Sequence, residues 1–211
     1  MKITVIIPRK NSQERKELHA EAIQSTFNQT FTDFHVITCE NGTLSENFNK
    51  GFKEAIYQKS EFIKILADDD LLTPNSLADL YNGAYPDTDL VIANAANFGD
   101  TNESFKSSYT NVKDLLIHNT IHGGTCLYRV SKLAEIALDN SNEVMREDLT
   151  TGEEYDLNIR VARAGGKISY IDKEVYKYRI HSGNKSLNYH DFDSRAARKL
   201  YIRERIVNRY L

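Results

Sequence analysis

Residues 62–70 read Phe-Ile-Lys-Ile-Leu-Ala-Asp-Asp-Asp, an apolar run that leads directly into three adjacent carboxylates. Such a run is typical of a buried strand, and in open α/β sheets ligands bind at the carboxyl ends of the strands. Adjacent carboxylates repel one another, and Mg²⁺ or Mn²⁺ is commonly held by carboxylates together with the phosphates of a substrate. We therefore expect Asp68, Asp69 and Asp70 to bind a metal or a nucleotide. A solvated acidic loop before the next helix is the alternative.

Strands and helices alternate on both sides of this stretch. Apolar runs predict further strands at residues 3–7, 34–38, 89–94, 124–128, 167–171 and 175–180. Apolar spacing and capping residues predict six helices. The first is capped by Asn11, with Glu14 as the partner in its capping box, and continues to Phe27. The others are predicted at residues 48–56, 73–80, 131–138, 153–164 and 194–210. This alternation predicts an α/β single domain with a mostly parallel central sheet flanked by helices.

The composition is that of a globular protein. The 211 residues are 40% hydrophobic and 27% charged, with ten Gly and three Pro, which excludes collagenous and low-complexity chains. Two cysteines, Cys39 and Cys126, are too few for a disulfide scaffold, and we expect them to be buried fillers. No apolar run approaches the roughly 18–20 residues that cross a bilayer, and no signal peptide is apparent. We expect a soluble, cytoplasmic protein.

Charge is unevenly distributed along the chain. The net charge of −3 gives no general case for nucleic-acid binding, but residues 194–211 hold six basic residues and one acid. Four arginines fall on one face of the predicted terminal helix: Arg195, Arg198, Arg205 and Arg209. A solvated face is the simplest interpretation, and weak docking on an anionic membrane surface or polymer is the alternative. Another face could pack on the domain or on a second subunit in a homodimer: Leu200, Val207 and Leu211.

Two later segments also carry chemistry. Glu153 and Glu154, in Thr151-Gly152-Glu153-Glu154-Tyr155-Asp156, open a predicted helix. Paired carboxylates there could include a general base, or could simply complement the helix dipole. In Tyr178-Arg179-Ile180-His181-Ser182-Gly183-Asn184, Arg179 could pair with phosphate and His181 could ligate a metal or contact a diphosphate. An ordinary strand-end turn is the alternative.

Taken in order, these segments resemble the family 2 glycosyltransferases of GT-A fold over about residues 3–184. The resemblance is carried by Val5-Ile6-Ile7-Pro8, by Ser25-Thr26-Phe27-Asn28-Gln29-Thr30-Phe31-Thr32-Asp33-Phe34 (S-x-x-x-Q-T-x-x-x-F), by Glu40-Asn41-Gly42-Thr43, by Ala67-Asp68-Asp69 at the DXD metal motif, by Gly152-Glu153-Glu154-Tyr155-Asp156 and by Tyr178-Arg179-Ile180-His181. Each motif is short, and their sequential order makes the joint signal strong.

The resemblance implies roles for individual residues. It implies nucleotide contacts at Pro8, Arg9, Glu40 and Asp68, phosphate contacts at Arg179 and His181, metal ligands at Asp69, Asp70 and His181, and catalytic carboxylates at Glu154, as base, and Glu153. The sequence departs from the family pattern at four places: Arg9-Lys10 replaces Thr-Tyr, Glu40 replaces Asp, Ala67 replaces the first Asp of DXD, and Glu154 replaces the usual Asp base. The residues at these positions can still supply the metal-binding and general-base chemistry of the family. The departures leave the identity of the sugar donor open.

The implied activity is that of a hexosyltransferase. A metal-dependent inverting enzyme would move a sugar from a nucleotide-sugar, a UDP-sugar in the first instance, to a hydroxyl of a glycan, a lipid-linked sugar or another polymer. Residues 1–100 would bind the donor, residues 101–184 the acceptor, especially Asn97–Ser108 and His118–Cys126, and residues 185–211 would form a basic helix on the domain. The alternatives are a catalytically silent nucleotide-sugar or glycan-binding protein and, ranked lower, a sugar-phosphate nucleotidyltransferase, for which Pro8-Arg9-Lys10-Asn11 lacks a glycine-rich loop.

Overall fold

The N-terminal apolar run forms β1 (Ile3–Pro8), in which all six residues are buried. It pairs in parallel with β2 (Phe34–Cys39) on one side and with β3 (Phe62–Ile65) on the other. Alternate side chains of β1 enter cores on opposite faces of the sheet, as the two-residue period of a strand requires. This parallel trio brings the ends of β1 and β3, and the residues that follow them, to one edge of the sheet.

The structure is a computed structural model that describes residues 1–10, 12–138, 143–182, 184 and 192–211. The predicted cap at Asn11 lies outside the described residues. A 3₁₀ turn at Gln13–Arg15 leads instead into α1 (Lys16–Phe27).

The second half of the sheet contains β7 (Leu127–Arg129), β5 (Leu90–Gly99), β8 (Ile168–Ile180) and β4 (Leu71–Leu72), with β6 (Ser104–Phe105) on the far end of β5. The strand order is β2-β1-β3-β7-β5-β8-β4. The long ladders, β1 with β2 and β3 and β5 with β8, are parallel, whereas the antiparallel ladders pair two or three residues each. The predicted α/β fold with a mostly parallel central sheet is confirmed, with β7 as an antiparallel insertion.

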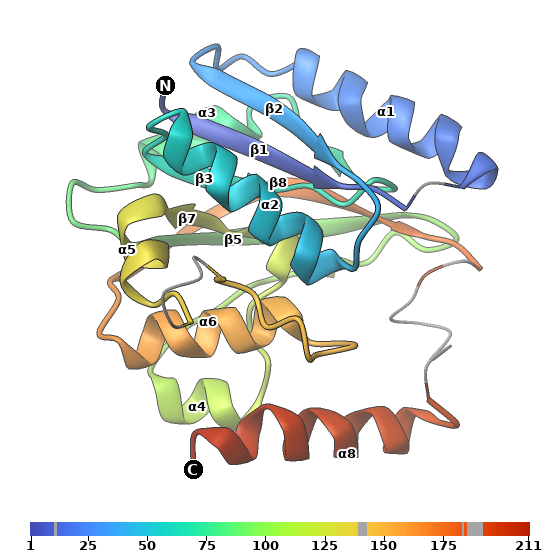
Figure 1. The fold of residues 1–211 in the computed structure, drawn as a ribbon. Coiled ribbons are helices and arrows are strands. Elements are labelled where there is room, and N and C mark those ends of the chain that lie inside the picture. Colours follow the sequence, from blue (N-terminus) through green and yellow to red (C-terminus); the bar gives the residue numbers. More distant parts are fainter. Residues whose placement is uncertain (11, 139–142, 183, 185–191) are drawn as a thin grey trace.

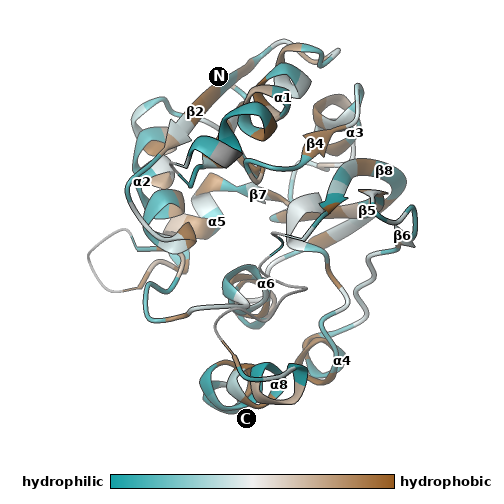
Figure 2. Cartoon of the chain, turned by 90° about the vertical axis from the view of Figure 1, so that its right-hand side faces the viewer, coloured by the Kyte–Doolittle hydropathy of each residue, from teal (hydrophilic) through white to brown (hydrophobic). Residues whose placement is uncertain are grey.

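Helices cover both faces of the sheet (Figure 1). On one face, α1 and α3 (Ser76–Asn82) bury Ala22, Leu77 and Leu80. On the other lie α2 (Leu44–Tyr57), α5 (Val130–Glu135) and α6 (Glu153–Arg163), with α4 (Val112–Ile117) and α8 (Arg195–Arg205, followed by a 3₁₀ turn at Val207–Arg209) outside α6. Apolar residues concentrate between these layers and on the inner sides of the helices (Figure 2). Among the described residues, no helix is both long and apolar enough to span a bilayer.

Several predicted boundaries differ from the structure. The strand expected at residues 124–128 is a 3₁₀ turn at Gly123–Thr125 followed by β7. The two strands expected at 167–171 and 175–180 are one strand, β8, whose polar middle is exposed. The helix expected from Thr73 begins at Ser76, because Gln29 Oε1, rather than a local cap, accepts the backbone N–H of Leu77 at 3.0 Å.

The terminal helix packs on the domain, but of the three residues expected to face it only Val207 packs against the core. Leu200 and Leu211 are exposed, whereas Ile206 is fully buried and Ile202 and Tyr201 pack against the core. Tyr201 Oη accepts the backbone N–H of Thr150 at 3.0 Å. The helix therefore lies against the segment that leads into α6.

Candidate active site

A cleft of about 680 Å³ opens where the ends of β1 and β3 face the N-terminus of α6. One wall carries Pro8, Arg9, Lys10, Arg15 and Asp68–Asp70. The opposite wall carries Thr151–Tyr155 and Arg198, and the residues between them include Asn119, Ile121–Gly124, Tyr176 and Tyr178. Of the two segments expected to bind an acceptor, residues 118–126 contribute to the lining and residues 97–108 do not.

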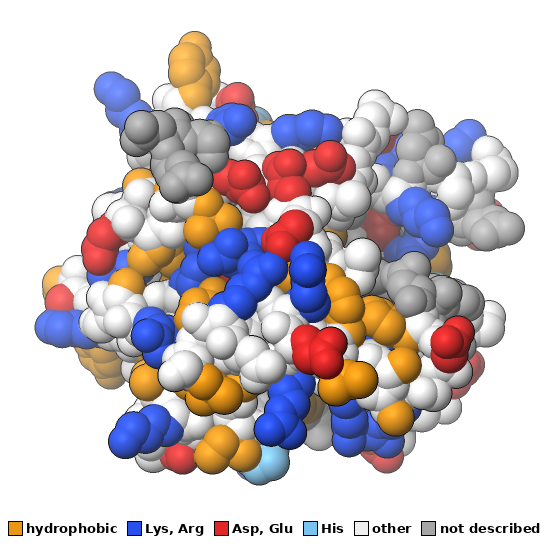
Figure 3. All heavy atoms as spheres, turned by 60° about the horizontal axis from the view of Figure 1, so that its bottom comes forward, with side chains coloured by type: hydrophobic (Ala, Val, Ile, Leu, Met, Phe, Trp, Pro, Cys, Tyr) orange, Lys and Arg blue, Asp and Glu red, His pale blue; other side chains and the backbone are white. Residues whose placement is uncertain are grey.

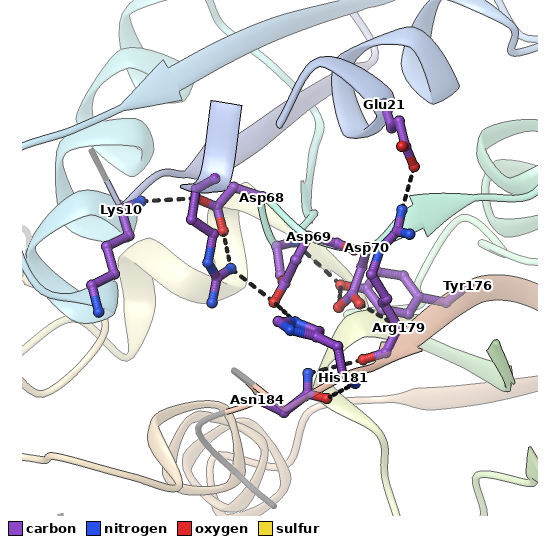
Figure 4. A network of polar contacts seen from close by, with 11 residues as sticks. Lys10, Glu21, Asp68, Asp69, Asp70, Tyr176, Arg179, His181 and Asn184 are labelled. Carbon is purple, nitrogen blue, oxygen red and sulfur yellow. Dashed lines mark hydrogen bonds and ion pairs between the residues drawn. The ribbon is translucent and has the colours of Figure 1, made fainter. Parts of the chain in front are cut away.

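Asp68 and Asp69 share a cation on the first wall. Arg15 Nη1 lies 2.6 Å from Asp68 Oδ1 and 2.7 Å from Asp69 Oδ2. The backbone N–H of Lys10 donates to Asp68 Oδ2 at 2.9 Å, and His181 Nε2 lies 3.1 Å from Asp69 Oδ2. Figure 4 shows the side chains of Asp69 and His181 turned toward each other, with Asp68 beside Asp69. The mutual repulsion expected of the carboxylates is thus offset by protein groups.

Asp70 differs from its two neighbours, because both of its oxygens are bound by β8. Tyr176 Oη donates to Oδ2 at 2.7 Å and the backbone N–H of Arg179 donates to Oδ1 at 2.7 Å. Burial, and then the charge of Asp69, raise the pKa of Asp70 to about 8. Asp70 therefore joins the loop after β3 to β8, and its lone pairs are less available to a metal than those of Asp69.

The end of β8 positions His181. Asn184 Oδ1 accepts the backbone N–H of His181 at 2.6 Å, and Asn184 Nδ2 donates to the carbonyl oxygen of Arg179 at 2.9 Å. The Arg179 side chain donates to the carbonyl oxygen of Asp69 at 2.8 Å and pairs with Glu21, so it does not line the cleft. His181 is thus held beside Asp69. Neither His181 nor Arg179 is among the residues that line the cleft.

Arg9 and Glu40 form an ion pair beside the cleft. Arg9 and Pro8 line the cleft, and Glu40 lies behind Arg9, with its carbonyl oxygen accepting from Lys50 Nζ at 3.0 Å. If Glu40 contacts a nucleotide as predicted, its carboxylate would do so from beside the Arg9 guanidinium.

The N-terminus of α6 presents two carboxylates to the cleft. Gly152 precedes the helix in the left-handed conformation, with φ of +80°, which favours glycine. Glu153 and Glu154 follow it and both line the cleft. Asp156, in contrast, is fully buried and pairs with Arg160 Nε at 2.9 Å, so its role is structural.

Gly123 abuts Glu154. A Cβ placed on Gly123 would lie 2.7 Å from Glu154 Cβ and 2.9 Å from Glu154 Cγ. Gly123 therefore leaves the Glu154 side chain little freedom to move toward it.

Lys64 joins the two halves of the site beneath the cleft. It is fully buried, and its Nζ donates to the carbonyl oxygens of Ile65, at 3.0 Å, and Gly124, while lying 4.9 Å from the centre of the Tyr176 ring. Burial lowers the pKa of Lys64 to about 7. In the sequence, Lys64 is the one charged residue within the apolar run at residues 62–66. That signal was available, but the sequence analysis did not assign Lys64 to the site.

His122 packs among aromatic rings at the floor of the cleft. Its ring centre lies 5.5 Å from that of Tyr176 and 5.3 Å from that of Tyr178, and its Nδ1 accepts the backbone N–H of Gly124 at 3.2 Å. Burial lowers the pKa of His122 to about 4, so this imidazole is neutral at neutral pH.

A divalent ion beside Asp69 would take the place of Arg15, which pairs with Asp69 Oδ2 at 2.7 Å, and would draw further ligands from a substrate. Within the described ranges, no group of three or more His, Cys, Asp or Glu side chains forms a complete metal site. Asp69 and His181 nevertheless offer a carboxylate and an imidazole within 3.1 Å. Mg²⁺ and Mn²⁺ sites commonly take one or two protein ligands and complete their coordination with phosphates and water.

Comparisons with known proteins agree with this architecture. The model of the family "Glycosyl transferase family 2" matches residues 13–146. EpsH of Bacillus subtilis (strain 168), which carries a provisional designation as a glycosyltransferase, is 29% identical over 157 residues. That match covers 70% of this chain and 45% of EpsH, so the chain spans about half the length of this relative.

Solved structures share the fold at low sequence identity. TarS 1–349 of S. aureus in complex with UDP-GlcNAc superposes with a TM-score of 0.69 and 17% identity, over 87% of this chain and 60% of that one. The mannosyltransferase PcManGT from Pyrobaculum calidifontis, in complex with GDP-Man and Mn²⁺, gives a TM-score of 0.58 and 13% identity, over 88% and 59%. The GT-A fold expected from the sequence is confirmed.

Proposed function

This chain belongs to glycosyl transferase family 2, and from that premise we propose that it is a metal-dependent, inverting glycosyltransferase that moves a sugar from a nucleotide-sugar to a hydroxyl acceptor. One arrangement carries the proposal: Asp69, which has His181 beside it, lines the same cleft as Glu153 and Glu154. The UDP-GlcNAc bound by TarS supports a UDP-sugar as the first donor to test.

In this proposal the donor lies along the first wall. Pro8, Arg9 and Asp68 would contact the nucleoside, with Glu40 acting beside Arg9. Asp69 and His181 would hold the divalent ion next to the diphosphate. When bound, the ion would supply Lewis-acid stabilisation of the negative charge that develops on the leaving diphosphate.

The acceptor would approach from the side of α6. Glu154 would take the proton of its hydroxyl while the acceptor oxygen bonds to the anomeric carbon and the bond to the diphosphate breaks. Attack opposite the leaving group inverts the anomeric configuration. Glu153, at the same helix N-terminus, would support the charge and geometry of Glu154. Residues 1–100, together with His181, would thus serve the donor, and the rest of residues 101–184 would serve the acceptor.

The proposal is tested by titrating UDP into the protein calorimetrically with and without Mn²⁺, and then by following nucleoside diphosphate release from a panel of UDP-, GDP- and dTDP-sugars. Metal-dependent nucleotide binding with release above the uncatalysed rate is expected. Binding with no release from any donor over time would favour the catalytically silent protein that Glu40, Ala67 and Glu154 suggest. Absence of any nucleotide binding would overturn the proposal.

A further inference from the structure

The terminal helix α8 is firmly docked beside the cleft. Ile206 is fully buried, and Tyr210 Oη donates to Asp156 Oδ1 at 2.6 Å. Arg205 and Arg209 both pair with Asp148, at 3.2 and 2.6 Å. Figure 3 shows this face of the molecule, where basic and acidic side chains are mixed. Because α8 is held at several points, a side chain on its inner face has a defined position.

Arg198 is the residue of α8 that lines the cleft. Its Nε and Nη2 donate to Thr151 Oγ1 at 3.1 and 2.9 Å. Thr151 is buried, with 5% of its surface exposed, so its hydroxyl is a fixed acceptor. Thr151 therefore holds the Arg198 guanidinium, which is planar and has five N–H donors, in place at the lining of the cleft.

The positive charge of Arg198 is not paired with a carboxylate among the described residues, whereas the charges of the other two arginines that line the cleft are. Arg9 pairs with Glu40, and Arg15 pairs with Asp68 and Asp69. Arg198 is bonded through its side chain to a neutral hydroxyl and, among the described residues, to no carboxylate. Its remaining donors suit an anionic group, since arginine binds phosphate and carboxylate with charge-assisted hydrogen bonds.

The position of Arg198 indicates which substrate would carry the anionic group that it binds, and that substrate is the acceptor. Thr151 lies two residues before Glu153, on the wall opposite Asp68 and Asp69. We propose, on the basis of the proposed function, that Arg198 and Thr151 form an anion subsite on the acceptor side of the cleft, so that the acceptor carries a phosphate or carboxylate near the hydroxyl that receives the sugar.

The test compares charged and neutral probes on the full chain. Glycerol 3-phosphate is compared with glycerol, and glucuronate with glucose, by NMR titration at constant ionic strength in the wild type, R198Q and R203Q. Arg203 lies on the same helix and is exposed, so R203Q removes the same charge outside the cleft. T151V keeps the size of Thr151 and removes the hydroxyl that orients Arg198. UDP titrations on each variant monitor the donor wall.

The charged probes should bind about tenfold more tightly than their neutral partners, and R198Q should remove that advantage. R203Q should keep the advantage, T151V should reduce it, and UDP affinity should not change in any of them. The proposal is overturned if charged and neutral probes bind alike, if R203Q loses as much as R198Q, or if R198Q weakens UDP instead. A wild type that binds the charged probes but no nucleotide would refute the proposed function and leave the subsite standing.

Discussion

His181 Nε2 lies 3.1 Å from Asp69 Oδ2, although 112 residues separate the two in the chain. The contact exists because β4, which directly follows Asp70, pairs with β8, Leu71 with Lys177, so the end of β8 lies beside the loop that follows β3. The same strand engages the neighbouring Asp70 through Tyr176 and the backbone of Arg179. Two adjacent carboxylates thus have different partners and are expected to have different roles.

We predict that D69N abolishes Mn²⁺-dependent binding of UDP and that H181A weakens it about tenfold, since each removes one ligand of the proposed ion. D70N is the matched control: its Oδ1 can still accept the Arg179 N–H, and its Nδ2 can donate to Tyr176 Oη once that hydroxyl turns its own proton away. Calorimetric titration of UDP at fixed Mn²⁺ measures all three. Loss of metal dependence in D70N as complete as in D69N would restore Asp70 to the ligands.

For Glu154, we predict that E154Q lowers the transfer rate by about 100- to 10,000-fold, the range that a general base contributes. UDP affinity should stay within about twofold of the wild type, because Glu154 lies on the wall opposite Asp69. E153Q, at the adjacent position, should cost less. Product formation from the best donor gives the rates, and normal transfer by E154Q would exclude it as the base.

G123A tests whether the backbone at Gly123 positions Glu154. The new Cβ would need the space 2.7 Å from Glu154 Cβ, so Glu154 must shift. Because a misplacement of about 1 Å can cost about 100-fold in rate, kcat should fall by about 10- to 100-fold. UDP binding should persist, which separates this effect from unfolding. Unchanged kcat would show that Glu154 has room to adapt.

Lys64 should make stability depend on pH. Its folded pKa of about 7 is below its unfolded value of 10.5, so between these values the unfolded chain holds a proton that the folded protein lacks. Stability therefore rises with pH in this window, by at most about 1.4 kcal/mol per unit. Chemical denaturation of wild type and K64M from pH 7 to 10 isolates this contribution, because other groups are common to both. A constant difference between the two would contradict it.

The long buried runs were predictable because burial on both faces leaves a continuous apolar signal, as in residues 3–7 and 62–66. The two-residue strands β4 and β6 and the short α4 carry no periodic signal and were missed. The polar residues Asp172-Lys173-Glu174 divided β8 in the prediction. They are exposed residues of one strand, at a place where the β5–β8 register is irregular.

The site was predictable only in part, for a related reason. Residues 68–70 were identified as a cluster and all three line the cleft, but which of them is bound by β8 depends on a strand register that the sequence does not reveal. Arg15 and Arg198 reach the cleft from helical segments whose spacing gave no sign of it. The assigned roles of Glu153, Glu154, Asp69 and His181 remain predictions.

Gly152 limits which substitutions are tolerated where α6 meets the end of α8. A side chain there would lie 2.8 Å from Ile206, and the φ of +80° independently disfavours one. Glu153 and Glu154, the proposed catalytic carboxylates, are on α6, whereas Arg198, proposed to bind the acceptor, is on α8. The end of α8 packs against α6 at Gly152, which has no side chain. Provided that Gly152, Ile206 and the hydrogen bond from Tyr210 to Asp156 are kept, the side chain at position 198 could change to suit another acceptor while α6 keeps its carboxylates.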